Sequence, residues 1–263
     1  MTADGWTKAV RQQLGLGRVL PLGGPHDGTW ITESAAVAAL RRTAAALRGL
    51  SLDRLRIEPA DSGAKEGKEG KEGAHGYDHD TAVPPPPSAL PPGPLRITAD
   101  LAAMAGPAPE PLPATAARLR TALFTAAGER LGLTVAEVDL RVTRLLEADA
   151  GPSGPAPAPP SSAAAPTAPA GDDEESRVAA AALSVPGVAR LTGALEGLGG
   201  PGGLGRPVDI AAGPALPRRH VRVELAVTEE RRALDVAREV RGAVTVCLPD
   251  HPSVAVLITA IGT

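Results

Sequence analysis

Two long stretches rich in proline and glycine interrupt this chain and limit the size of any core that it can build. Residues 61–94 contain Lys-Glu-Gly three times in succession and then four consecutive prolines, and residues 149–171 are almost entirely Pro, Ala, Ser and Gly. Neither stretch has enough apolar side chains to offset the entropy lost on ordering, so both are predicted to be disordered. The rest of the 263 residues forms two blocks, each near the lower end of ordinary domain size.

We therefore predict four parts: an N-terminal segment (1–20), a first unit (21–148) with the disordered insertion 61–94, a disordered linker (149–171) and a second unit (172–263). In the N-terminal segment, Trp6, Val10 and Leu14 have the spacing of an amphipathic helix, with Lys8 and Arg11 between them. Such a segment either docks on its own first block or binds a membrane surface or a partner.

Both blocks show helical and strand periodicity in the same order. In the first, the predicted elements are a helix from Thr32 to about Leu47, strands at 52–57 and 95–101, a helix from Pro113 and a strand at 138–142. In the second, they are a helix after Asp173 that ends at Pro186-Gly187, strands around 188–191, 208–210 and 221–227, a helix after Thr228 that carries Val236 to Cys247, and a strand at 254–261.

The shared order indicates an internal duplication, in which residues 95–146 correspond to residues 221–261. The predicted fold class is α+β, with two small two-layer units that each run helix, strands, helix, strand. Helices cover one face of each sheet, and the open sheet edges can pair with further strands. The second face is solvated or contacts a partner, and it carries Arg96, Asp100, Asp139, Arg141, Arg222 and Glu224.

Composition and charge argue against several classes of protein. The net charge is −3 without a strongly basic face, and the single Cys247 cannot form an internal disulfide. Residues 1–20 lack the apolar stretch of a secretory signal. The longest nearly uncharged apolar run, residues 178–189, is broken by Pro186-Gly187 and is too short to span a bilayer. We expect a cytoplasmic protein.

Four patterns were considered as sites, and the structural interpretation is favoured for each. Residues 197–202 match a dinucleotide-binding glycine pattern, but a strand follows where a helix is needed. His75, Asp78, His79 and Asp80 have the types and spacing of metal ligands, but they lie in a linker without a scaffold. Cys247 lies on the apolar side of a helix, where a buried thiol is inert.

The fourth pattern is the basic cluster at residues 218–222, which lacks aromatic residues for stacking on bases. Its favoured interpretation is a solvated start of a strand. We therefore predict no catalytic, cofactor-binding or metal-binding residues and no enzyme activity.

One resemblance goes further than these patterns. Residues 178–183, then Val185-Pro186-Gly187-Val188, the strand 221–227, Ala237-Arg238-Glu239-Val240-Arg241 and the strand 254–258 resemble the alkaline-shock-protein family, small cytoplasmic stress proteins of Gram-positive bacteria. The first block resembles a diverged second copy without the Pro-Gly-Val turn and with a long insertion. The resemblance implies a role in envelope or general stress, self-association, and recruitment to the membrane through an anchored partner. It implies no catalytic residues.

The leading hypothesis is therefore a non-catalytic assembly or scaffold protein that binds other proteins through open sheet faces or edges. One alternative is a nucleic-acid-binding module that uses residues 218–222, with affinity that falls steeply as salt rises. A second alternative is an enzyme with a site between the two units, which predicts a pocket lined by titratable groups with shifted pKa values.

Overall fold

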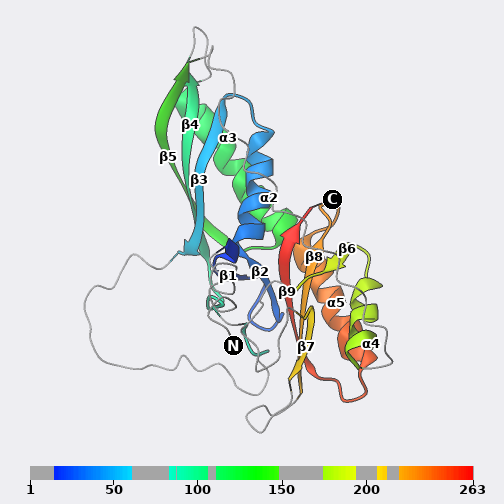
Figure 1. Ribbon diagram of the computed structural model, residues 1–263. Helices are drawn as coiled ribbons and strands as arrows, with labels where there is room; N and C mark the ends of the chain where they lie inside the picture. Colours follow the sequence, from blue (N-terminus) through cyan, green and yellow to red (C-terminus); the bar gives the residue numbers. More distant parts are fainter. Residues whose placement is uncertain are drawn as a thin grey trace, which may run out of the picture.

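The described part of the chain is a mixed α+β fold, as the sequence predicts. The structure is a computed structural model that describes residues 15–60, 83–86, 88–105, 111–147, 174–193, 206–211 and 219–262. These residues form four α-helices and nine strands in two sheets (Figure 1). None of the helices within these ranges is long and apolar enough to cross a membrane.

The smaller sheet has three strands in the order β3-β4-β5 and belongs to the first block. β3 (Leu50–Pro59) is antiparallel to β4 (Leu95–Ala105), and β5 (Val135–Glu147) is parallel to β4. A parallel pair needs a crossover connection, which α3 (Leu112–Thr125) and the π-helix η1 (Ala126–Leu131) provide. α2 (Glu33–Ala45) lies beside α3 on the same face, and the Thr32 hydroxyl caps it by accepting from the Ala35 N–H.

The larger sheet takes strands from both blocks. Its order is β1-β2-β9-β8-β6, with β7 also paired to β8. The bounds are β1 (Val19–Pro21), β2 (Thr29–Thr32), β6 (Val188–Leu191), β7 (Val208–Ala211), β8 (His220–Val227) and β9 (Ser253–Ile261). β8 and β9 are parallel and joined through α5 (Ala233–Cys247), against which α4 (Glu174–Leu183) packs (Figure 1).

The pairing of β2 with β9 was not predicted from the sequence. The two strands are parallel, and Thr29, Trp30 and Ile31 lie opposite Val256, Leu257 and Ile258. The first block therefore adds β1 and β2 to the sheet of the second block. One continuous cluster of buried side chains, which includes Leu40, Ile97 and Val256, joins both sheets and their helices.

The second face of the larger sheet is also covered. Successive side chains of a strand point to opposite faces, so Trp30 and Leu257 lie away from the main core. They form a smaller buried cluster with Val19, Ala255 and Val83. Val83 belongs to the stretch 61–94 that the sequence marks as disordered. The end of that stretch has an apolar side chain that the sheet can bury, whereas residues 61–82 and 87 lie outside the described residues.

The loop between β1 and β2 is fixed to α5 by Asp27. The Asp27 carboxylate accepts hydrogen bonds from Arg238 Nε and Nη2 at 3.0 and 2.8 Å, and from the Gly24 N–H at 2.6 Å. The Arg238 hydrogen bond is the main reason that the pKa of Asp27 lies below its ordinary value, against a smaller opposing effect of burial. This carboxylate joins residues more than two hundred positions apart in the chain.

Replacing Asp27 with asparagine is expected to lower the free energy of unfolding by about 1–2 kcal/mol at pH 7. A carboxyl whose pKa is lowered by folding stabilises the protein above its unfolded pKa of about 3.9, and this contribution is lost as the pH falls through the folded pKa. Urea denaturation of both proteins should therefore give curves that converge below about pH 4. The control is Asp235→Asn. The Asp235 carboxylate is about half exposed and comes no closer than 3.8 Å to the guanidinium groups of Arg232 and Arg238, so its ion pairs are weak. An equal loss in the two variants at pH 7 would contradict the role of Asp27.

Candidate functional site

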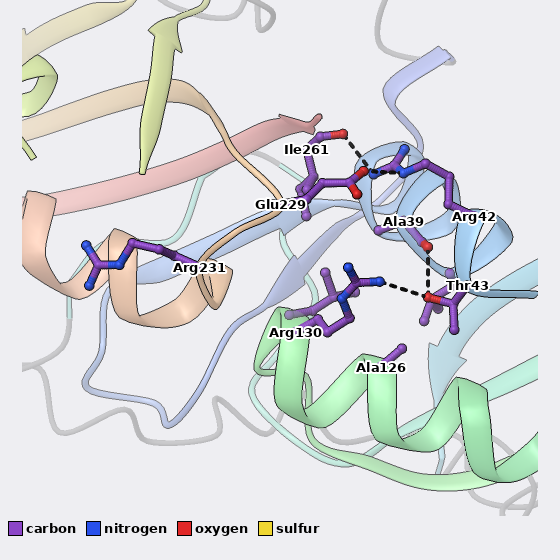
Figure 2. A pocket seen from close by; sticks show the side chains of 10 residues that line it. Ala39, Arg42, Thr43, Ala126, Arg130, Glu229, Arg231 and Ile261 are labelled. Atoms are coloured by element: carbon purple, nitrogen blue, oxygen red, sulfur yellow. Dashed lines mark hydrogen bonds and ion pairs between the residues drawn. The ribbon is translucent and has the colours of Figure 1, made fainter. Parts of the chain in front are cut away.

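The junction between the two sheets contains a small cavity (Figure 2). Arg42 of α2 forms an ion pair with Glu229 and donates to the Ile261 carbonyl oxygen at 2.9 Å. From the π-helix, Arg130 Nη1 donates to the Thr43 hydroxyl at 3.4 Å. The space open to the centre of a water molecule is about 20 Å³, which is room for about one water. The cavity is therefore too small for an organic substrate.

A second hollow lies over α2, α3 and η1 and opens broadly to solvent. Its volume by the same measure is about 640 Å³, in the range of ligand pockets. Ala117, Thr121, Ala122 and Thr125 line it with small side chains. The charged side chains of Arg118, Glu129 and Arg130 complete the lining.

Two of the patterns considered from the sequence, residues 197–202 and His75 to Asp80, lie outside the described residues. Within the described ranges, no three His, Cys, Asp or Glu side chains are close enough to hold a metal ion. Cys247 is half-buried, and its Sγ donates to the Val244 carbonyl oxygen at 3.2 Å. Burial raises the pKa of this thiol, which lowers the population of the nucleophilic thiolate.

The basic cluster at the start of β8 is largely neutralised. Arg219 lies 2.8 Å from a carboxylate oxygen of Glu174 and 3.1 Å from one of Asp250. Arg222 is only 15% exposed and contacts two carboxylates, whereas Arg218 lies outside the described residues. Phosphate binding would require Arg219 and Arg222 to leave carboxylate partners that they already have.

His220 and Ser253 form a polar pair that the sequence did not point to. His220 Nδ1 lies 2.9 Å from Ser253 Oγ, across the parallel β8–β9 pairing. The serine hydroxyl donates to the Arg219 carbonyl oxygen at 3.3 Å. Burial, aided by the Arg222 charge, lowers the pKa of His220 and keeps the imidazole neutral at pH 7. These contacts tie the starts of β8 and β9 together.

The free edge of β5 is the surface that best fits a binding role. β5 has thirteen residues, pairs with β4 on one side, and has no strand on its other side among the described residues (Figure 1). Two large apolar side chains near its end are exposed, Val142 at 41% and Leu145 at 60%. A long edge with unpaired backbone groups and apolar side chains is a template for another strand.

The outer face of the smaller sheet carries Arg96, Asp100, Asp139 and Arg141, as the sequence predicts. Arg96 lies 2.6 Å from a carboxylate oxygen of Glu137 and 3.5 Å from one of Asp139. Asp100 lies opposite Arg141 in the register. The prediction fails for Glu224 in the larger sheet, which is 2% exposed rather than solvated.

Comparisons of the chain with protein-family models, with curated proteins and with solved structures gave no match. The function is therefore argued from the geometry of the chain itself.

Proposed function

We propose that this protein is a non-catalytic assembly protein that binds other proteins through the free edge of β5. The observation that carries the proposal is that no strand of the described residues pairs with the second edge of the thirteen-residue β5, where the side chains of Val142 and Leu145 are exposed. Proteins usually protect such an edge with proline, lysine, a bulge or a covering element; β5 contains no proline or lysine, and its register with β4 shifts at Thr143. An edge left open accepts an added strand through backbone hydrogen bonds, and the neighbouring side chains give specificity.

Strand order supports the proposed internal duplication. In the first block, the path α2-β3-β4-α3-β5 contains an antiparallel pair followed by a parallel pair with a helical crossover. In the second block, the path α4-β6-β8-α5-β9 contains the same pairs in the same order. The corresponding edges differ, because β2 covers the edge of β9 whereas β5 keeps its edge free within the described residues. The proposed binding edge thus belongs to the first copy alone.

The resemblance to the alkaline-shock-protein family supplies the proposed cellular setting. We place the protein in envelope or general stress, in the cytoplasm, with recruitment to the membrane through an anchored partner. The sequence pattern Val185-Pro186-Gly187-Val188 is part of this resemblance, and in the structure it forms the turn between α4 and β6. Gly187 has φ +95°, a conformation that suits glycine at this turn.

Replacing Val142 and Leu145 together with lysine is expected to abolish capture of partner proteins from extracts of the producing cells. Lysine on an edge strand opposes the approach of a second strand. Both positions are exposed, so the free energy of unfolding should change by no more than about 1 kcal/mol, as thermal denaturation can verify. The control is Val246→Lys on α5, where the side chain is 76% exposed and far from β5 in the fold (Figure 1).

Quantitative mass spectrometry of the captured proteins gives the measurement. The wild type and Val246→Lys should retain the same set, and the double lysine variant should lose it. If the double variant retains the same proteins as the wild type, the β5 edge is not the binding surface.

A further inference from the structure

The charges along β5 have opposite signs on the two sides of Leu140. Glu137 and Asp139 precede Leu140, whereas Arg141 and Arg144 follow it. In the pairing with β4, these four residues lie opposite Arg96, Thr98, Asp100 and Ala102. Along β4, those residues alternate with Ile97, Ala99 and Leu101, which are buried against the helices. All four charged side chains therefore lie on the outer face of the sheet.

The charges that β4 and β3 supply leave this arrangement unbalanced. The Arg96 guanidinium is shared between Glu137 and Asp139, so two carboxylates have one cation. Arg141 makes no ion pair within 4.0 Å in the described part of the chain. Before Leu140, two carboxylates thus share one guanidinium. After Leu140, Arg144 is already paired with Asp53 at 2.7 Å, so the unused positive charge is that of Arg141.

We propose that the β5 edge binds a second copy of this chain, with the two β5 strands antiparallel and related by a two-fold axis through Leu140. This inference rests on the proposed function and names the partner. In that register Asp139 lies opposite the partner's Arg141, and Arg141 lies opposite the partner's Asp139. Opposite charges in directly facing positions stabilise a strand pair.

The same register fits the other side chains of β5. The register with β4 shifts between Leu101 and Ala102, which leaves Thr143 as an extra residue and brings Arg144 to the outer-face position after Arg141. Glu137 then faces the partner's Arg144, but Glu137 and Arg144 already pair with Arg96 and Asp53 of their own chain, so the Asp139–Arg141 pairs carry the register. On the helix side, the exposed Val142 faces the partner's Val138, so apolar area is covered. A parallel pairing in register would instead place like charges opposite one another.

The two-fold axis is perpendicular to the sheet, so the two three-stranded sheets join into one sheet of six strands with the helices on one side. An edge of this length gives an interface at the small end of the range for specific complexes. We therefore expect a dimer with a dissociation constant on the order of 1–100 µM, which forms and separates with concentration.

Charge reversal at the two facing positions tests this register. Asp139→Arg places two arginines opposite two arginines in the homodimer, and Arg141→Asp does the same with carboxylates. Each variant should weaken self-association at least about tenfold. An equal mixture of the two variants should associate with wild-type affinity, because each arginine then faces an aspartate. The matched control is Arg56→Asp, an exposed arginine on the outer face of β3, which should dimerise like the wild type.

Sedimentation velocity from about 1 to 200 µM covers the affinities of small interfaces and gives the dissociation constants. Circular dichroism verifies that each variant is folded. The mixture provides a second check, because variants that associate with each other must both be folded. Restored association in the mixture, with none in either variant alone, supports the register. A wild type that stays monomeric overturns the proposal, as does a dimer that is insensitive to both reversals. If the wild type is monomeric and the double lysine variant still loses its captured proteins, the edge binds a different protein and the proposed function stands.

Discussion

Alanine in place of Gly132 is expected to lower the free energy of unfolding by about 2–5 kcal/mol. Gly132 follows the π-helix in the left-handed conformation, with φ +94° and ψ +22°. A Cβ atom there would lie 2.4 Å from the Leu234 Cβ. The substitution therefore combines an unfavourable backbone conformation with a steric overlap at the base of a buried side chain.

Gly132 lies at the contact between the first and second blocks. The Gly132 carbonyl oxygen accepts from the Gly23 N–H at 3.1 Å, and the nearby Gly128 carbonyl oxygen accepts from the Arg232 guanidinium at 3.0 and 3.2 Å. The turn after η1 is therefore held against the β1–β2 loop, and η1 itself against the start of α5. Displacing Leu234 would separate elements that share one core.

Two other glycines separate the conformational effect from the steric one. Gly49 has φ +84° but no atom within 4 Å of an added Cβ, so Gly49→Ala should cost only about 1 kcal/mol. Gly242 lies inside α5 with open space around it, and alanine there should be neutral or stabilise by up to about 1 kcal/mol. Urea denaturation followed by circular dichroism gives the three values. A cost at Gly132 no greater than that at Gly49 would mean that the close approach to Leu234 is absent in solution.

Local periodicity was enough to predict most helices and strands. Alternation across residues 221–227 marks β8, and its Val221, Val223 and Leu225 are all buried as an alternating strand requires. The same pattern at residues 138–142 placed Asp139 and Arg141 on the outer face, which the register with β4 confirms. Local sequence records these features because side-chain direction follows from backbone geometry alone.

Features that depend on distant parts of the chain were not predictable. β1 has three residues next to a segment rich in glycine and proline, and β2 pairs with β9 across more than two hundred positions. Strand alternation places Glu224 on the face of the larger sheet away from α4 and α5, but it does not predict that other parts of the chain cover this face. For the β5 edge, the charges were visible in the sequence, but the free edge follows only from the strand order β3-β4-β5.

A second large loss of stability is expected when Arg222 is replaced, because this arginine lies beside the buried carboxylate of Glu224. The Glu224 side chain is 2% exposed, and Arg222 Nε lies 3.6 Å from its Oε1 without a hydrogen-bond partner in the described structure. Arg222 Nη2 also lies 3.3 Å from Asp209 Oδ2. The arginine thus supplies positive charge to a buried carboxylate on the central part of the larger sheet.

Replacing Arg222 with methionine is expected to cost about 2–3 kcal/mol of unfolding free energy, somewhat less than for a fully buried pair because Arg222 is 15% exposed. Methionine keeps an unbranched apolar side chain but leaves the Glu224 charge without this cation. Adding Glu224→Gln to the same protein should recover part of the loss, because the buried charge is then absent. The control is Arg206→Met, whose arginine is 63% exposed and pairs with Glu175 at 2.9 Å, and which should cost no more than about 1 kcal/mol.

Urea denaturation of Arg222→Met, of the double variant with Glu224→Gln, and of Arg206→Met distinguishes an electrostatic role of Arg222 from a packing role. If the stem of Arg222 matters more than its charge, methionine will preserve most of the stability and Glu224→Gln will add a further loss. If the charge matters, the double variant will be more stable than Arg222→Met alone. The second outcome would also show that Arg222, the least exposed described arginine of the basic cluster, is committed to a carboxylate inside the fold.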